Sequence, residues 1–218
     1  MSNPVIVVVG AGPGMGASVA RRFARDGFDV ALIGLPPEVL EELGQQLQSE
    51  GITTGWTPVD VTDQKGLHDA VTRFGQHAGR IDVLHFNPSA FRQKDPLVLP
   101  VDELLHDVAL GVGALLTAVQ AARPFMTAGA RVTATGSMAA DKPWNEAASL
   151  GVQKAGLRNL VRSLDKTLET DGIRAVSVTV NGTLGRGTPF DPDLIADAIH
   201  AAAHQAENEW RAEVPYDG

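Results

Sequence analysis

Cysteine is absent from the sequence of 218 residues. The chain therefore has no disulfide bond, no thiolate nucleophile and no cysteine-ligated metal. Of the six histidines, His200 and His204 lie four residues apart on one predicted helix face, without a third ligand nearby. His85 lies within an apolar run, where a histidine is typically a hydrogen-bonded core residue. We expect no metal site, because a bound zinc ion needs at least three protein ligands.

Positive charge and long apolar runs are also scarce. Lys and Arg number 18 against 26 Asp and Glu, which gives a formal net charge of −8, and the basic residues are scattered. Phosphate backbones and anionic membranes are bound by clustered basic residues, so we expect no nucleic-acid or membrane partner. No apolar run approaches the roughly 18 residues of a membrane span, and no secretory signal is visible. These absences predict a cytoplasmic location.

Tyrosine occurs once, as Tyr216, two residues from the C-terminus. A tyrosine hydroxyl is one of the few side-chain groups that can exchange a proton with a substrate. The sequence offers no tyrosine for this task outside its terminal segment.

Apolar, β-rich runs alternate with segments of helical periodicity along the whole chain. This alternation is typical of a parallel sheet covered by helices on both faces. We predict a doubly wound α/β fold of about seven strands, in a single domain over residues 1–218. The predicted strands are 5–9, 29–35, 53–59, 81–86, 131–135, 173–180 and 210–214. The predicted helices are 15–26, 37–49, 63–76, 101–127, 146–170 and 192–205.

The first predicted strand runs directly into the glycine-rich stretch VVVGAGPGMGAS and then into a helix. Glycines in this setting allow a tight turn, let the backbone approach a pyrophosphate and leave the first helical amides facing that anion. We assign these roles to Gly10, Gly14 and Gly16; the alternative is a turn with a purely structural role. The stretch predicts a dinucleotide-binding Rossmann fold, and the absence of Gly-Lys-Ser/Thr argues against a nucleotide triphosphatase.

Four landmarks, in this order, resemble the short-chain dehydrogenase/reductase family over nearly the whole chain. The stretch 10–16 is similar to the family's TGxxxGxG, with valine in place of the threonine. Asp60-Val61 is similar to the family's adenine-contacting pair after the third strand. Asn87 retains one residue of the Asn-Asn-Ala-Gly after the fourth strand, and Gly182 stands near the Pro-Gly turn after the sixth. The resemblance implies an NAD or NADP cofactor, contacted by Gly10, Gly14, Met15, Gly16, Asp60, Val61, Asn87, Lys154 and Gly182.

The catalytic residues of the family are only partly present. In the family, a tyrosine exchanges a proton with the substrate, and a lysine four residues later binds the nicotinamide ribose and lowers the tyrosine pKa. A serine polarises the carbonyl, and an asparagine completes a proton relay. Ser137 and Lys154 match the serine and the lysine, whereas Leu150 stands at the tyrosine position and Gly111 aligns with the asparagine. The resemblance therefore implies an atypical member with altered proton-transfer machinery.

Several residues are candidates for completing such a site. Asp141 and Lys142, in a loop expected to border the substrate pocket, and a water held by Ser137 are candidate substitutes for the missing acid. Ordinary solvated loop charges are the alternative interpretation of the first two. Trp144 and Phe91 follow the fifth and fourth strands, where they are candidates either for the pocket wall or for plain packing.

The choice between NAD and NADP stays open in the sequence. The family reads the ribose 2′ position at the end of the second strand, with an acid for the hydroxyl or an Arg for the 2′-phosphate. Here the stretch 34–37 reads GLPP, which has neither. Arg21, Arg22 and Lys142 are the cations that could be recruited, although each is more typical of a solvated surface.

Three functions remain compatible with these residues. The first is an NAD(P)-dependent oxidoreductase acting on a small carbonyl or alcohol, and the second is a non-catalytic NAD(P)-binding protein. The third is an assembly subunit, because helices 101–127 and 146–170 correspond to those that form the family's dimer interface. A homodimer or homotetramer fits all three.

Overall fold

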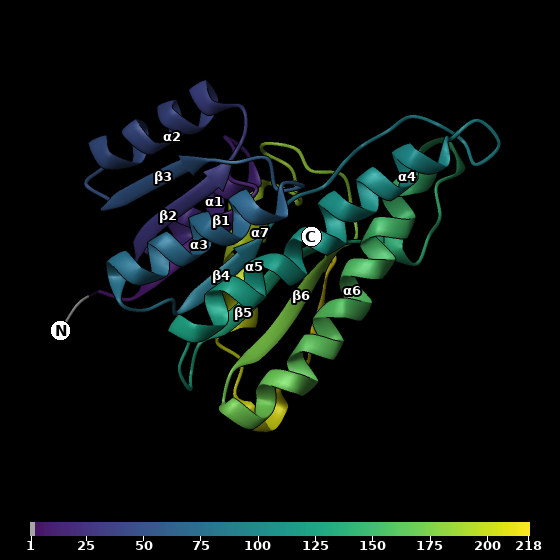
Figure 1. The fold of residues 1–218 in the computed structure, drawn as a ribbon. Helices are drawn as coiled ribbons and strands as arrows, with labels where there is room; N and C mark the ends of the chain where they lie inside the picture. Colours follow the sequence, from purple (N-terminus) through teal and green to yellow (C-terminus); the bar gives the residue numbers. More distant parts are fainter. Residues whose placement is uncertain (1–2) are drawn as a thin grey trace.

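The computed structural model describes residues 3–218, which form one seven-stranded sheet with the order β3-β2-β1-β4-β5-β6-β7. Every pairing between neighbouring strands is parallel. The sheet confirms the predicted doubly wound fold (Figure 1). The strands are β1 Val5–Val9, β2 Asp29–Gly34, β3 Thr54–Pro58, β4 Val83–Phe86, β5 Arg131–Ser137, β6 Arg174–Val180 and β7 Glu213–Tyr216.

Helices cover both faces of the sheet. One apolar core lies between the sheet and α3, α5 and α6, and a second lies between the sheet and α1, α2 and α7. Figure 1 shows α3, α5 and α6 in front of the strands. The helices are α1 Met15–Ala24, α2 Pro37–Ser49, α3 Gln64–Ala78, α4 Val101–Val108, α5 Ala114–Ala122, α6 Ala148–Leu168 and α7 Pro192–Ala203.

The strand order places a binding edge at the centre of the sheet. All five residues of β1, VIVVV, are buried, and this strand pairs with β2 on one side and β4 on the other. The chain winds outward in opposite directions from this point, so the carboxyl edge between β1 and β4 is the topological switch point at which open parallel sheets form their crevices. Ligands of open parallel sheets bind in such crevices.

The predicted helix 101–127 is interrupted in the structure. A π-helical segment, Ala109–Gly113, separates α4 from α5, and a 3₁₀ turn, Arg123–Phe125, follows α5. Val101–Phe125 is long and apolar enough, with a mean hydropathy of 1.5, to cross a membrane by length and composition alone. The count of consecutive apolar residues did not indicate this. Leu115 and Ala118 of α5 are nevertheless fully buried against the sheet, as expected of a core helix.

The last strand differs from its prediction. Residues 210–214 were expected to form it, but β7 is Glu213–Tyr216. Trp210 instead lies beneath the guanidinium groups of Arg131 and Arg174, which are 5.1 and 4.9 Å from its ring centroid. These cation–π contacts hold the indole away from the sheet ladder.

Close packing between β2 and the turn after β1 leads to a stability prediction. A Cβ added at Gly34, the last residue of β2, would lie 2.4 Å from the carbonyl oxygen of Ala11. We expect Gly34→Ala to lower the free energy of unfolding by about 1–3 kcal/mol, because the backbone must shift to relieve the overlap. Gly55→Ala in the neighbouring β3 is the control, since a Cβ there makes only an ordinary 3.4 Å contact with Phe74. Equal urea midpoints for the two variants would contradict this interpretation.

Candidate functional site

A glycine turn connects β1 to α1 at the carboxyl edge of the sheet. Gly10 has a φ of +79°, which side-chain-bearing residues rarely adopt, and a Cβ there would lie 2.7 Å from Pro88. The amides of Gly10 and Ala11 both donate to the carbonyl oxygen of Ile33, at 2.9 Å. The turn is therefore fixed between the end of β2 and the loop that follows β4.

The outer side of this turn is open. A Cβ added at Gly12 or Gly14 would meet no protein atom within 4 Å, so packing inside the chain does not require glycine at either position. Helix α1 begins directly afterwards, and no side chain caps its N-terminus. Its first amides and the helix dipole are therefore available to an anion. This combination is what a phosphate needs to approach the backbone closely.

A cavity of about 590 Å³ lies above this turn. This volume is within the usual range of small-molecule and cofactor sites. The cavity is lined by seven of the nine residues expected to contact a cofactor and also by Ser137, expected to be catalytic: Gly10, Gly14, Met15, Gly16, Asn87, Ser137, Lys154 and Gly182. The structure thus brings together residues that are far apart in the sequence. Their individual roles stay predictions.

Asp60 and Val61 lie outside the residues that line this cavity. The carboxylate of Asp60 accepts hydrogen bonds from the amide and the hydroxyl of Thr62, at 2.9 and 2.7 Å. These bonds lower the pKa of Asp60. The side chain of Val61 is 8% exposed and packs in the core beneath α3. Contact of this pair with an adenine also stays a prediction.

Asn87 connects β4 to the glycine turn. Its backbone amide donates to the carbonyl oxygen of Val9 at 2.9 Å, and its side-chain amide donates to that of Gly10 at 3.1 Å. The side chain therefore holds the turn in shape from within the cavity wall.

The Lys154 side chain is buried at the carboxyl end of β5. It is 5% exposed, and its Nζ donates to the carbonyl oxygen of Thr135 at 2.9 Å. Among the described residues, no carboxylate lies within ion-pair distance of this amine. Burial lowers the pKa of Lys154 to about 8.

Histidine His85 faces Lys154 from β4. It is fully buried, its Nδ1 lies 2.9 Å from the hydroxyl of Thr133, and burial together with the Lys154 charge lowers its pKa to about 3. It is therefore neutral at ordinary pH, and it is hydrogen-bonded in the core as the sequence indicated.

Ser137 and Leu150 line the cavity near Lys154. Ser137 is the last residue of β5, and its hydroxyl oxygen accepts a hydrogen bond from the amide of Ala139 at 3.2 Å. Leu150 is in the first turn of α6, one helical turn before Lys154. Among the described residues that line the cavity, Lys154 alone has a side chain that ionises between pH 2 and 12.

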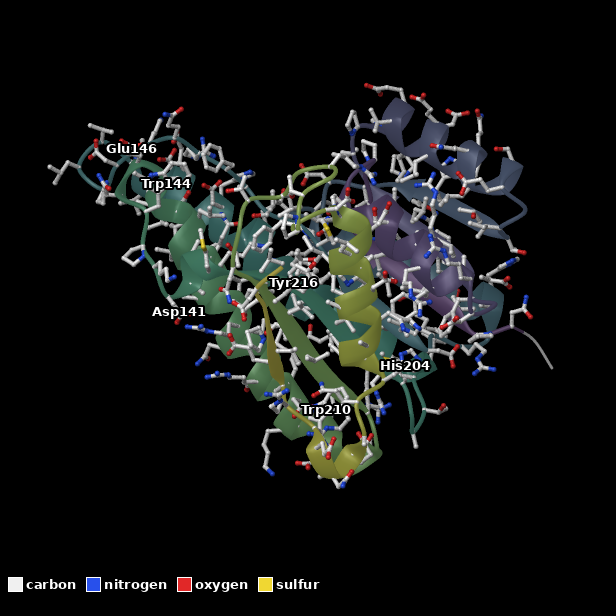
Figure 2. The ribbon with its side chains drawn as sticks, turned by 180° about the vertical axis from the view of Figure 1, so that it is seen from behind. Asp141, Trp144, Glu146, His204, Trp210 and Tyr216 are labelled. Atoms are coloured by element: carbon white, nitrogen blue, oxygen red, sulfur yellow. The ribbon has the colours of Figure 1, made fainter. Side chains whose placement is uncertain are left out.

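Tyr216 is engaged outside the cavity. It pairs with Val180 at the end of β7, and its hydroxyl donates to the carbonyl oxygen of Pro189 at 2.7 Å. Its ring packs edge-on against Phe190, whose ring in turn lies where a Cβ on Gly182 would be. Figure 2 shows Tyr216 at one end of the last strand and Trp210 before the other. This single tyrosine therefore anchors the segment after β6.

Asp141 and Lys142, two of the candidate substitutes for a missing acid, lie outside the cavity lining. Asp141 forms an ion pair with Arg158 at 2.6 Å, which lowers the pKa of its carboxyl group, and Lys142 is exposed. Trp144 and Phe91 form an aromatic pair, 5.5 Å between ring centroids, beyond the cavity wall. Asp141 and Trp144 are labelled in Figure 2.

The match to known proteins decides the family. The sequence pattern of short chain dehydrogenases matches residues 4–189. The chain belongs to the short-chain dehydrogenase family. An uncharacterized oxidoreductase of Staphylococcus epidermidis, SERP2049, is 24% identical over 216 residues, which cover 94% of this chain and 93% of that protein. The oxidoreductase UcpA of Escherichia coli K12 is 28% identical over 184 residues, covering 82% and 68%.

Solved structures of the same family share the fold. A short chain dehydrogenase of Burkholderia cenocepacia J2315, solved in complex with NADP, superposes with a TM-score of 0.88 at 24% identity, covering 99% of this chain and 96% of that one. The short-chain dehydrogenase/reductase of Serratia marcescens BCRC 10948 gives a TM-score of 0.88 at 22% identity, covering 100% and 97%. These likenesses show that the chain shares the Rossmann-like sheet of the family.

Among the described residues that line the cavity, none at the end of β2 is charged. Leu35 lines the cavity at the end of β2. Arg21 is held by Glu50 at 2.8 Å, and Arg22 is held by Asp197 at 2.9 Å. Arg21 and Arg22 are thus engaged in ion pairs, and Lys142 lies outside the cavity lining.

Sequence reasoning missed several residues that line the site. Leu110, Leu184 and Ser89 contribute to the cavity wall, and Thr135 contributes its backbone carbonyl to Lys154. The carbonyl leaves no signature in the sequence, because every residue carries one.

The buried amine of Lys154 leads to a prediction about pH and stability. Below pH 8 the Lys154 amine is charged in both the folded and the unfolded state. In the folded state this charge has lost its hydration. Between pH 8 and about 10.5 the unfolded state binds a proton that the folded state has released, so stability rises with pH. We expect Lys154→Met to raise the free energy of unfolding at pH 7 by about 3 kcal/mol, and this gain to shrink above pH 8.

Denaturant unfolding between pH 6 and 10 measures this effect. Lys166→Met on the same helix is the matched control, because Lys166 is 85% exposed and its removal changes stability little. A gain for Lys154→Met that does not depend on pH would show that desolvation of the charge is not its cause.

Proposed function

We propose that this chain is an NAD(P)-linked oxidoreductase that acts on a small carbonyl or alcohol, with Lys154 as the group that exchanges the proton. The observation that carries the proposal is the single cavity that joins the open glycine turn to Ser137 and Lys154. A turn that served structure alone would not need glycine at Gly12 and Gly14, where a Cβ meets open space.

The residues present fit a dinucleotide. The turn from Gly10 to Gly16 and the first amides of α1 would hold the pyrophosphate. Asp60 and Val61 would lie toward the adenine, and the backbone around Gly182 toward the nicotinamide. A bound dinucleotide would supply or accept the hydride. Apart from Lys154, which is assigned to the proton step, the described residues of the cavity lining include no cation for a 2′-phosphate and no acid for a 2′-hydroxyl, so the proposal covers both NAD and NADP.

The proton step is assigned to this chain's own side chains. Leu150 stands at the position of the family's tyrosine, and its side chain cannot carry a proton. When hydride reaches the carbonyl carbon, the ammonium of Lys154 gives one proton to the carbonyl oxygen, which becomes the hydroxyl of the product. The neutral amine then takes a proton from water. Ser137 donates a hydrogen bond to the same oxygen and stabilises its developing charge.

The pH dependence of the reaction tests the role of Lys154. Its pKa of about 8 means that the proton donor is lost above that pH, with His85 neutral and, among residues 3–218, no carboxylate within ion-pair distance of the amine. We expect kcat/KM for carbonyl reduction to fall about tenfold per pH unit above 8. We expect kcat/KM for alcohol oxidation, which needs the neutral amine, to rise about tenfold per pH unit below 8 and to level off above it.

Lys154→Arg is the matched variant for that profile. Arginine keeps a cation and its hydrogen bonds but does not release a proton in this pH range. We expect it to bind dinucleotide and to reduce carbonyls at least about 100-fold more slowly. A wild-type profile that stays flat from pH 7 to 10, or an active Lys154→Arg variant, would rule out Lys154 as the donor.

Substitutions at Leu150 test whether proton transfer limits the rate. Leu150→Tyr places a phenol one helical turn from Lys154, and we expect carbonyl reduction to become about 100- to 10,000-fold faster. Leu150→Phe is the control, because it adds the same ring without the hydroxyl. Equal rates for the two variants would mean that the absent hydroxyl does not limit this protein.

A non-catalytic dinucleotide-binding protein is the second candidate function, and Leu150 is the observation that favours it. It predicts dinucleotide binding without oxidation or reduction of any carbonyl or alcohol tested.

Under either function, we infer a homodimer or homotetramer in the cytoplasm. The helix pair α5 and α6 supports such an assembly, because Leu116, Leu160 and Leu164 line a shallow apolar groove between the two helices.

A further inference from the structure

The side chain of Gln153 is completely buried between α6 and the loop after β4. Its Nε2 donates to the carbonyl oxygen of Ala90 at 2.9 Å, and its Oε1 accepts from the amide of Ala90 at 3.0 Å. The side-chain amide therefore satisfies both backbone groups of one residue, as a neighbouring strand would. Loss of this amide would leave two backbone polar groups unpaired in a part-buried place.

Ala90 ends the segment that forms one wall of the dinucleotide cavity. Asn87, Pro88 and Ser89 line the cavity directly before it. Asn87 donates to the carbonyl oxygen of Gly10, and Pro88 lies where a Cβ on Gly10 would be. The segment is thus fixed at one end by the glycine turn and at the other by Gln153, which directly precedes Lys154.

Gln153 also explains the glycine in the π-helical segment of the long helix. A Cβ added at Gly111 would lie 2.6 Å from Oε1 of Gln153 and 3.0 Å from its Cβ. A side chain at position 111 therefore overlaps with an amide that is held in place by its hydrogen bonds to Ala90 and Ser149. A Cβ on Gly156, one turn further along α6, would lie 3.0 Å from Val112, so the helices are in close contact along this stretch.

We propose that Gln153 is a positioning residue that holds the cavity wall 87–90 in its binding shape, and that Gly111 and Gln153 are a matched pair in which the amide fills the space of a residue-111 side chain. The effect on dinucleotide binding rests on the proposed function. The packing of Gly111 against Gln153 does not depend on that function. One consequence is that Gly111→Asn, made to rebuild the family's relay, disrupts the wall unless Gln153 is shortened as well.

The first experiment measures the wall directly. Gln153→Met keeps the length of the side chain and removes both hydrogen bonds with Ala90, whereas Gln46→Met makes the same change at an exposed position of α2. We expect the Ala90 amide to exchange its hydrogen about tenfold faster or more in Gln153→Met by NMR, with no change in Gln46→Met. Unchanged exchange at Ala90 would overturn the positioning role.

The second experiment is a stability cycle. We expect Gly111→Ala to lower the unfolding midpoint by about 5 °C in the wild-type background. In the Gln153→Ala background the overlap with the amide is gone, and we expect less than half of that loss. Equal losses in the two backgrounds would overturn the matched pair.

Dinucleotide titration separates this inference from the proposed function. If the parent protein binds a dinucleotide, Gln153→Met should weaken the affinity about tenfold, and wild-type affinity in that variant would contradict positioning of the site. If the parent binds none of the dinucleotides, the proposed function fails, whereas the exchange and stability measurements still decide the role of Gln153.

Discussion

One buried hydrogen bond sets the arrangement of the site. The Nζ of Lys154 reaches from α6 to the carbonyl oxygen of Thr135, at the point where β5 ends. Because β1 and β5 both flank β4 in the sheet, this bond places the amine at the same edge as the glycine turn. Ser137, two residues beyond Thr135 on the same strand, then faces the cavity from the same side.

Burial of the Lys154 amine affects both the stability of the fold and the pKa of the amine. Burial leaves the Lys154 side chain 5% exposed and removes most of the hydration of its charge. Low hydration makes the buried ammonium unfavourable for stability, and it also brings the pKa of Lys154 to about 8, close to the pH at which a general acid works well. Functional sites typically contain residues that destabilise the fold, and Lys154 is such a residue at the site where chemistry is expected.

Most of the sheet could be predicted from the sequence, because β1, β2, β4 and β6 are rich in apolar residues and alternate with helical segments. The seventh strand was predicted to start at residue 210 rather than at residue 213, since Trp210 looks like a strand residue but contacts Arg131 and Arg174, which are far away along the chain. The lining residues at the glycine turn were predicted for the same local reason. The contact of Gln153 with Ala90 was not, because it joins residues 63 positions apart.

Calorimetric titration of the purified protein with NAD⁺, NADH, NADP⁺ and NADPH tests the central claim most directly. The open backbone at Gly12 and Gly14 and the uncapped start of α1 predict micromolar binding of one oxidised and reduced pair, and loss of that binding in Gly12→Val, whose side chain would enter the cavity. Absence of binding by all four dinucleotides, in a protein that is folded, would contradict the account.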